Sequence, residues 1–163
     1  MTSNFLPLLQ ARAVYVSLAA SAAALAGAFI AQYGFNLHPC ELCLMQRLPY
    51  ALVIGLGILY ACGFKKDIPI LGLMGSAFVV GTGLAAFHVG VEQHWWEGFT
   101  ACSARLNTSD LNALREQIIN GPQARCDQVA WSFAGISMAG FNFFYSLILS
   151  ALTFSALLKK RLP

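Results

Sequence analysis

Long apolar runs separated by short polar stretches dominate the hydrophobic pattern of the chain. Four of the runs carry no acidic or basic residue, taking histidine as neutral, and they cover residues 13–33, 48–64, 68–91 and 133–158. A helix rises about 1.5 Å per residue, so about 20 apolar residues cross a hydrocarbon core of about 30 Å. The run 48–64 is short, but Arg47 and Lys65 at its ends can extend toward the membrane interfaces. The pattern therefore predicts four transmembrane helices.

Composition agrees with a membrane protein. Hydrophobic residues make up 58% of the 163 residues and charged residues only 10%, whereas about 25% is typical of soluble domains. The length suits one domain. We therefore expect a single all-α integral membrane domain over residues 1–163, folded as a bundle of four transmembrane helices.

A cleaved signal peptide is the alternative interpretation of the first run. Residues 21–27 are rich in small side chains that could form a cleavage site. The apolar run is longer than the roughly 7–15 residues of a signal-peptide core, and Arg12 is the only basic residue before it. We therefore expect the first run to remain as a transmembrane helix.

Basic residues are distributed unevenly between the two sides of the predicted bundle. The side that holds both termini and the turn at 65–67 carries six cations against Asp67: Arg12, Lys65, Lys66, Lys159, Lys160 and Arg161. Cations are enriched on the cytoplasmic side of membrane proteins. We therefore expect cytoplasmic termini and outer loops at residues 34–47 and 92–132. The net charge of +3 follows from this topology and does not indicate nucleic-acid binding.

The second outer loop contains the pattern of a short amphipathic helix. Leu111, Leu114 and Ile118 recur at helical spacing, and Gly121-Pro122 follows as a stop. We expect this helix to lie on the membrane surface.

Four of the five cysteines fall on the predicted outer side, where disulfides form and persist. These are Cys40, Cys43, Cys102 and Cys126. Cys62, at the cytoplasmic end of a span, is interpreted as a small packing residue.

The closely spaced pair Cys40-x-x-Cys43 could serve two chemistries. Zinc needs four ligands, often two such pairs, but Cys102 and Cys126 are far apart, and the three histidines do not form a second short pair. Dithiol–disulfide exchange needs only the pair, a lowered thiol pKa and an oxidant. The spacing favours exchange, and we expect no metal site. A structural disulfide clip is a further alternative, although so small a ring would restrain the unfolded chain little.

Arg47 follows the pair and admits two interpretations. Its guanidinium could favour thiolate on Cys43 and donate hydrogen bonds to a carbonyl-bearing ligand, or it could simply extend to the interface from a helix end. Pro49 leaves open whether the helix reaches back to Cys43, because the ring disfavours a preceding helical turn.

Cys102 and Cys126 bracket the predicted amphipathic helix. A disulfide between them would stabilise the fold by about 3 kcal/mol through loop closure. A second dithiol on the same side as Cys40 and Cys43 could instead pass electrons to the first pair by exchange. The residues alone leave both possibilities open.

Several motifs together resemble the DsbB family of disulfide bond formation proteins, and the resemblance covers essentially the whole chain. They are Pro39-Cys40-Glu41-Leu42-Cys43 with Gln46-Arg47-Leu48-Pro49-Tyr50, the Cys102/Cys126 loop, Arg125-Cys126-Asp127 through Trp131-Ser132-Phe133, and Ser137-Met138-Ala139-Gly140.

The resemblance implies an activity and a location. The chain would be a protein-dithiol:quinone oxidoreductase of the bacterial inner membrane, with both termini cytoplasmic and the cysteine loops periplasmic. It would reoxidise a periplasmic thioredoxin-fold thiol oxidase of the DsbA type and pass the electrons to ubiquinone or menaquinone.

The resemblance also implies a role for each cysteine. Cys102 would form the mixed disulfide with the partner, and Cys126 would be its pair. Cys40 would exchange with Cys126, which leaves Cys43 as the thiolate that faces the quinone, beside Arg47. The family's quinone-site histidine could correspond to His88 or His94, although His88 is equally interpretable as a polar residue facing the bundle.

Two other functions are compatible with the sequence. An enzyme of the vitamin K epoxide reductase type also combines four membrane helices with a CxxC pair and a quinone, but its pair lies near the end of a later span. A non-enzymatic metal-binding or structural membrane protein is the alternative from another class.

Overall fold

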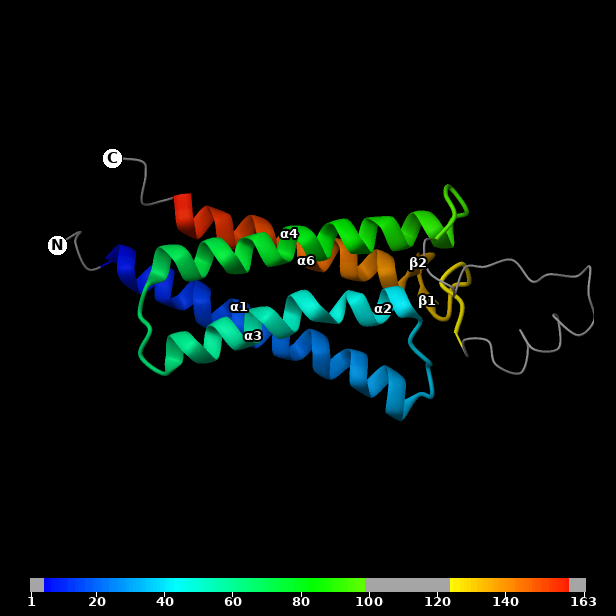
Figure 1. Cartoon of the computed structure of the whole chain (residues 1–163), viewed down its shortest axis with the longest axis horizontal. Coiled ribbons are helices and arrows are strands. Elements are labelled where there is room, and N and C mark those ends of the chain that lie inside the picture. Colours follow the sequence, from blue (N-terminus) through cyan, green and yellow to red (C-terminus); the bar gives the residue numbers. More distant parts are fainter. Residues whose placement is uncertain (1–4, 99–123, 159–163) are drawn as a thin grey trace, which may run out of the picture.

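The computed structural model describes residues 5–98 and 124–158. Its elements in chain order are α1 (Phe5–Phe29), the π-helical turn η1 (Ile30–Gly34), α2 (Glu41–Met45), α3 (Arg47–Ala61), α4 (Asp67–Glu92), β1 (Ser132–Phe133), β2 (Ile136–Ser137) and α6 (Met138–Leu158) (Figure 1).

Four helical segments are long and apolar enough to cross a membrane. They are Pro7–Gly34, Glu41–Ala61, Asp67–Glu92 and Met138–Leu158. The predicted all-α fold with four membrane-spanning helices is therefore confirmed, and the protein is a multi-pass membrane protein. The amphipathic helix predicted around Leu111, Leu114 and Ile118 lies outside the described residues.

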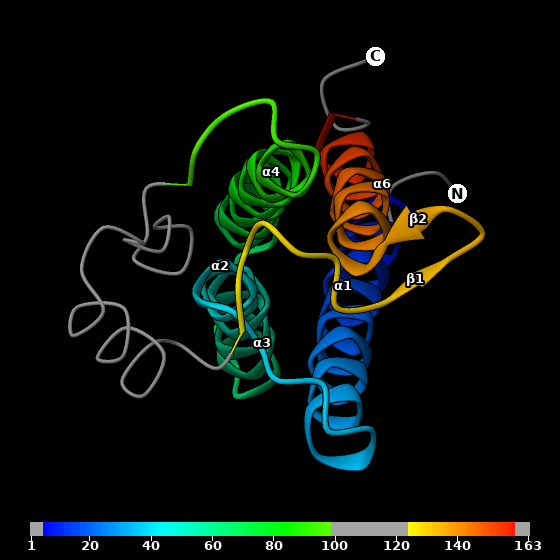
Figure 2. The same ribbon diagram turned by 90° about the vertical axis from the view of Figure 1, so that its right-hand side faces the viewer.

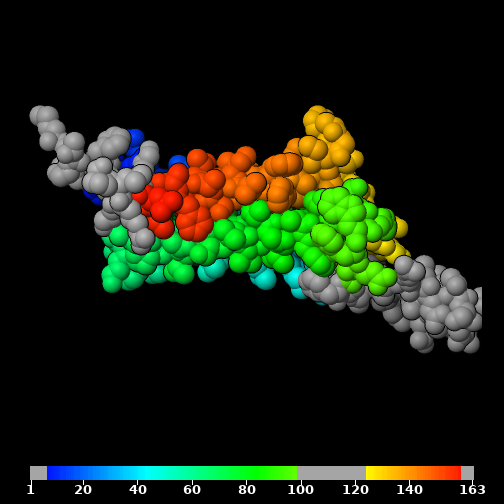
Figure 3. Space-filling model, turned by 90° about the horizontal axis from the view of Figure 1, so that it is seen from above, coloured from blue at the N-terminus to red at the C-terminus, as the bar shows by residue number. Residues whose placement is uncertain are grey.

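The spans form a bundle in which α1 and α6 lie on one side and α3 and α4 on the other (Figure 2). Along the bundle α4 packs beside α6, as Figure 3 shows, and α1 packs against α3. Buried side chains from all of these helices form the core, among them Val14, Tyr50, Val53, Phe78 and Leu149. At Gly75 an added Cβ would lie 2.9 Å from the Phe154 ring, so this glycine permits the close approach of α4 to α6.

The bundle has two different ends. The start of α1, the end of α6 and the α3–α4 connection lie at one end, whereas the α1–α2 connection, the end of α4 and the β1–β2 hairpin lie at the other (Figure 1). The described residues of the candidate site discussed below lie at or near the end with the hairpin.

The second helical segment begins earlier than the sequence analysis predicted. We expected residues 34–47 to be loop and the helix to start at residue 48, but α2 begins at Glu41 and α3 follows at Arg47. Pro49 has no N–H to donate, and the regular helix is interrupted only at Gln46, which itself keeps a helical backbone (φ −67°, ψ −17°). The proline therefore breaks the hydrogen bonding without ending the helical path.

The last apolar run is not helical from its start. Ser132 pairs with Ser137, and Phe133 with Ile136, in a short antiparallel hairpin. The two turn residues have positive φ, 52° at Ala134 and 80° at Gly135, as the commonest tight hairpin turn requires. The expected helix start near residue 133 was therefore wrong, and α6 starts at Met138.

Candidate functional site

Cys40 lies at the N-cap of α2, with an extended backbone (φ −76°, ψ 173°). Its sulfur accepts a hydrogen bond from the Cys43 backbone N–H at 3.3 Å, and its thiol donates to Cys43 Sγ at 3.0 Å. A cap of this kind satisfies one of the free N–H groups at a helix start. The CxxC spacing thus places both sulfurs together at the positive end of the second span.

Burial and hydrogen bonding separate the roles of the two sulfurs. Donation to Cys43 and burial of the side chain, which is only 5% exposed, raise the pKa of Cys40 to about 12, although His88 acts in the opposite direction. In the reduced pair Cys40 therefore keeps its proton. Cys43 Sγ accepts the hydrogen bond within the pair, and this hydrogen bond stabilises a thiolate on Cys43.

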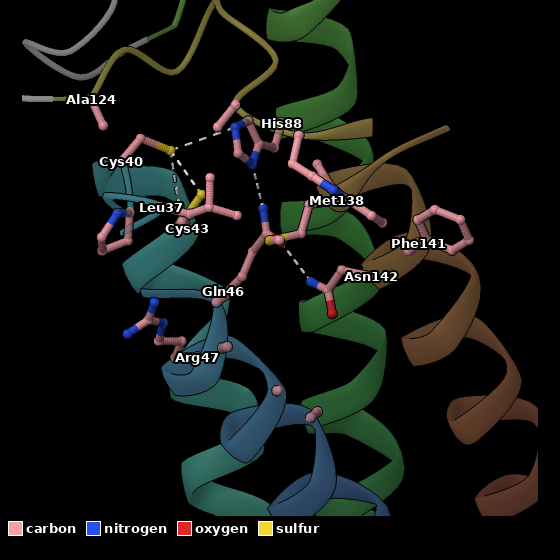
Figure 4. A pocket seen from close by; sticks show the side chains of 18 of the residues that line it. Leu37, Cys40, Cys43, Gln46, Arg47, His88, Ala124, Met138, Phe141 and Asn142 are labelled. Carbon is pink, nitrogen blue, oxygen red and sulfur yellow. Dashed lines mark hydrogen bonds between the residues drawn. The ribbon is translucent and has the colours of Figure 1, made fainter. Parts of the chain in front are cut away.

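His88 projects from α4 onto this pair (Figure 4). Its Nε2 lies 3.6 Å from Cys40 Sγ, and its Nδ1 lies 2.8 Å from the side-chain amide nitrogen of Gln46. An amide nitrogen can only donate, so Nδ1 is the acceptor and Nε2 carries the proton. That proton faces the sulfur of Cys40.

The hydrogen bonds continue from Gln46 across the bundle. Asn142 of α6 donates from Nδ2 to Gln46 Oε1 at 2.5 Å, and Tyr50 of α3 donates from its hydroxyl to Asn142 Oδ1 at 2.6 Å. The chain therefore runs in one direction from Tyr50 through Asn142, Gln46 and His88 to Cys40. Three spans together fix the orientation of the imidazole ring.

Glu92 joins this cluster at the end of α4, where its side chain is buried. Its Oε1 lies 3.9 Å from His88 Nε2, and Ser137 Oγ donates to its Oε2. Ser137 also accepts from the Gly140 N–H at 3.1 Å, as an N-cap of α6 does. The hairpin is thereby tied to the cluster around His88.

Arg47 lies one helical turn after Cys43 on the same path but points away from His88 (Figure 4). Its guanidinium donates to Gln32 Oε1 at 2.8 Å and lies 5.1 Å from the centre of the Phe29 ring. Gln32 belongs to η1 and Phe29 ends α1. Arg47 is therefore held by the first span, an arrangement that neither interpretation of the sequence anticipated. Isolated π-helical turns of this kind often occur at functional sites.

A mostly apolar pocket of about 560 Å³ opens beside these groups. Its lining includes both cysteines of the pair, Arg47 and His88, with apolar residues of α1 and α6. Pockets with apolar walls and a few convergent polar groups are typical ligand sites.

The remaining predicted site residues are not all brought together. Cys126 is fully buried and shares one cluster with Cys40, Leu42 and Val91. Cys102 lies outside the described residues. His94 follows α4, is exposed, and is not among the described residues that line the pocket.

Sequence reasoning missed Gln32, Gln46 and Asn142 as members of the site. Each is a neutral amide in or beside an apolar run, and polar groups within membrane spans are costly unless they serve a purpose. That signal was present in the sequence, but it does not indicate which partner each amide contacts.

Comparison with known proteins decides the family. The sequence model of the family described as "Disulfide bond formation protein DsbB" matches residues 10–156. The chain belongs to the DsbB family. It is therefore a membrane protein of disulfide bond formation, and its relatives support a disulfide-forming oxidoreductase.

Individual relatives are distant in sequence but match most of the chain. Disulfide bond formation protein B 2 of Pseudomonas putida is 30% identical over 150 residues, which cover 85% of each chain. Disulfide bond formation protein B of Nitrosococcus oceani is 28% identical over 137 residues, or 80% of this chain and 79% of the relative. An uncharacterized protein of Rickettsia prowazekii, RP370, is 25% identical over 82% of this chain and 80% of its own length. No solved structure gives a significant match.

Proposed function

We propose that this protein reoxidises a periplasmic thioredoxin-fold thiol oxidase of the DsbA type and transfers the electrons to a membrane quinone. The observation that carries the proposal is the placement of the Cys40–Cys43 pair. It lies in the wall of an apolar pocket between membrane-spanning helices, and Cys126 is buried in the same cluster.

The first step would take place at the outer cysteines. A thiolate of the partner would attack the Cys102–Cys126 disulfide at Cys102, forming a mixed disulfide and releasing Cys126 as thiolate. Cys126 would then attack Cys40, because the two residues share one buried cluster, and Cys43 would leave as thiolate. Each disulfide that breaks is replaced by a new one, and the electrons of the partner thereby move toward the Cys40–Cys43 pair at the membrane.

Residues of the second span would stabilise the released sulfur. The N-terminal end of α2 carries partial positive charge, and Arg47 adds a full charge one turn later. The second thiolate of the partner would attack its own mixed disulfide, so that the partner leaves oxidised and Cys102 is released as thiolate. Cys102 would then attack Cys126 in the Cys40–Cys126 disulfide, which closes the Cys102–Cys126 disulfide and leaves Cys40 and Cys43 as the reduced pair. A quinone held in the pocket would take two electrons and two protons from this pair as the Cys40–Cys43 disulfide forms again, and would leave as hydroquinone.

The pocket fits such a ligand. Its apolar wall from α1 and α6 suits an apolar ring and tail, and Arg47 offers a charged donor for a carbonyl oxygen. His88 donates to Cys40 and lies on the same pocket. We therefore assign the quinone-side histidine to His88 rather than His94.

Orientation in the membrane follows from the same proposal. The end of the bundle that holds Cys40 would face the periplasm of a bacterial inner membrane, and the end that holds Lys65 and Lys66 would face the cytoplasm.

Quinone-dependent turnover tests the proposal. Purified protein, a reduced DsbA-type oxidase and either ubiquinone or menaquinone should give catalytic quinone reduction, followed spectroscopically. The control is the Cys40→Ser variant, in which the outer pair can react only once. Failure with both quinones, or normal turnover by the control, would contradict the proposal.

A further inference from the structure

We propose that the reduced Cys40–Cys43 pair and His88 form a binding site for a soft divalent cation, of which Zn²⁺ is the representative. The site would exist only in the reduced state, because a disulfide offers no thiolate. Metal binding does not depend on the quinone reaction. Only its consequence, inhibition of turnover, rests on the proposed function.

Three ligand atoms already lie together. Cys40 Sγ, Cys43 Sγ and a ring nitrogen of His88 are within 4.8 Å of one another. Two thiolates and one imidazole are a known donor set for zinc with an open fourth position. The sulfurs come from the start of α2 and the imidazole from α4, so the second and third spans fix the set.

The distances are close to those of a tetrahedral site. Zinc bonds of about 2.3 Å to sulfur and 2.0–2.1 Å to nitrogen place sulfur and nitrogen ligands about 3.6 Å apart and two sulfurs about 3.8 Å apart. Cys40 Sγ and His88 Nε2 are 3.6 Å apart. The two sulfurs are 3.0 Å apart, so they must move apart to about 3.8 Å to bind the same ion. Rotation of the partly exposed Cys43 side chain can provide this movement.

His88 must present a lone pair on Nε2 to bind the ion. This requires the proton to be on Nδ1, and Gln46 lies 2.8 Å from that atom. If the Gln46 amide turns over, its oxygen accepts the Nδ1 proton and its nitrogen donates to Asn142, whose amide turns over in the same way. Tyr50 then accepts instead of donating. The whole chain can therefore reverse without losing a hydrogen bond, and it would orient the ligand as second-shell carbonyls do in zinc sites.

Charge also favours a cation here. Glu92 is buried, and its Oε1 lies 3.9 Å from His88 Nε2. It lies outside the three-ligand set, and its negative charge adds attraction for a divalent ion. Binding would displace the protons of both thiols, so affinity should fall as the pH is lowered.

Metal titration of the full chain in detergent tests the site. The parent variant carries Cys62→Ser, Cys102→Ser and Cys126→Ser, which leaves only the two thiols of interest. Reduced parent should bind one Co²⁺ per chain, with thiolate-to-cobalt charge-transfer bands and the visible bands of tetrahedral cobalt, and Zn²⁺ should displace it. Parent protein oxidised to the disulfide should show none of these bands.

Variants of His88 distinguish a three-ligand metal site from metal binding by the two thiols alone. His88→Gln should weaken Zn²⁺ binding about 100-fold, measured by competition with a chromophoric chelator. His88→Cys should restore affinity and intensify the charge-transfer bands, because a third thiolate replaces nitrogen. His38→Gln is the matched control, an exposed histidine that precedes the pair, and should leave the affinity unchanged.

Three outcomes would overturn the proposal. They are no metal binding by reduced parent, equal affinity in His88→Gln and parent, or an unchanged cobalt spectrum in His88→Cys. Because all three outcomes are read from metal binding, the site can be found even if quinone turnover fails, and turnover can be found without the site. If the proposed function holds as well, Zn²⁺ should inhibit turnover of the wild-type protein, because each catalytic cycle passes through the reduced pair.

Discussion

The two ends of the second membrane span both carry cysteine, yet they surround it differently. Cys40 and Cys43 lie at the N-terminal end, where partial positive charge stabilises thiolate, whereas Cys62 is the C-cap of α3, at the end that carries partial negative charge. Cys40 is buried and contacts Cys43 and His88, whereas Cys62 is exposed.

Polar contacts at the two ends also serve different purposes. Near Cys62, the Tyr60 hydroxyl donates to Asp67 at 2.6 Å, and Lys65 donates to the Tyr15 hydroxyl at 3.0 Å while lying 4.3 Å from the Tyr60 ring. These contacts fasten α1, α3 and α4 together. Near Cys40, the hydrogen bonds converge on one sulfur. The position of a cysteine relative to the helix end and to its neighbours, rather than its presence in a span, therefore distinguishes the Cys40–Cys43 pair from Cys62. The packing role expected for Cys62 was wrong, because its side chain is exposed.

Replacing one cysteine at each end of the second span should give the largest difference in quinone-dependent turnover. We expect Cys43→Ser to reduce quinone-dependent turnover to the background of the assay, because the sulfur that would face the quinone is lost. Cys62→Ser should retain full turnover and the same melting temperature. Comparable losses in both variants would remove the distinction between the two ends.

Alkylation of the reduced protein should show a second, smaller contrast. Hydrogen-bond donation to Cys43 and burial raise the pKa of Cys40 to about 12, so at pH 8 this thiol stays protonated. We expect limited iodoacetamide to modify Cys43 before Cys40, and Cys62 to be modified in both the reduced and the oxidised protein. Peptide mass spectrometry measures all three, and preferential labelling of Cys40 would contradict the assigned direction of the hydrogen bond between the sulfurs.

Loss of the cation near the pair should affect quinone binding rather than folding. A hydrogen bond from a charged group contributes about 1.5–3 kcal/mol, so Arg47→Ala should raise the apparent KM for quinone roughly 10- to 100-fold. Lys65→Ala, which removes a cation at the other end of the span, is the matched control and should leave KM unchanged. If both variants behave alike, Arg47 serves only as a membrane anchor.

Breaking the hydrogen-bond chain that runs from Tyr50 to Cys40 should reduce turnover less than removing the groups that the chain orients. Asn142→Leu leaves Gln46 Oε1 without its donor, and His88 can then turn away from Cys40. We expect kcat to fall about tenfold, corresponding to about 1.4 kcal/mol, with a changed pH profile. Ser155→Ala, at the opposite end of α6, should alter neither. A loss of thermal stability with an unchanged pH profile would indicate a purely structural role for Asn142.

Local patterns in the sequence predicted the four spans, because each is an uninterrupted apolar run and lipid forces such a run into a helix. They did not predict where the second span starts. The rule for Pro49 argued against a helix before it, and nothing in the sequence indicated that the sulfur of Cys40 would cap one. Phe133 and Ile136 are as apolar as the helix that follows them, so the pattern could not separate the hairpin from α6.

The sequence predicted the reactive groups of the site but not the contacts that hold these groups in place. The Cys40–Cys43 pair and Arg47 are adjacent in sequence, and their chemistry is visible there. His88 reaches Cys40, and Asn142 reaches Gln46, only because three spans pack side by side. Contacts of this kind depend on the rotation of each helix about its own axis, which the composition of an apolar run does not fix.

The smallest expected effect concerns the groups that hold Arg47. Gln32→Ala removes the acceptor of its hydrogen bond but leaves the Phe29 ring beneath the guanidinium. An exposed or partly exposed contact of this kind contributes about 1 kcal/mol, so the apparent KM for quinone should rise only about fivefold. In an Arg47→Ala background the same substitution should have no further effect, because Gln32 acts through the arginine. Additive increases in the double variant would instead mean that Gln32 contacts the quinone itself, and the first span would then be part of the quinone site rather than a support for the second.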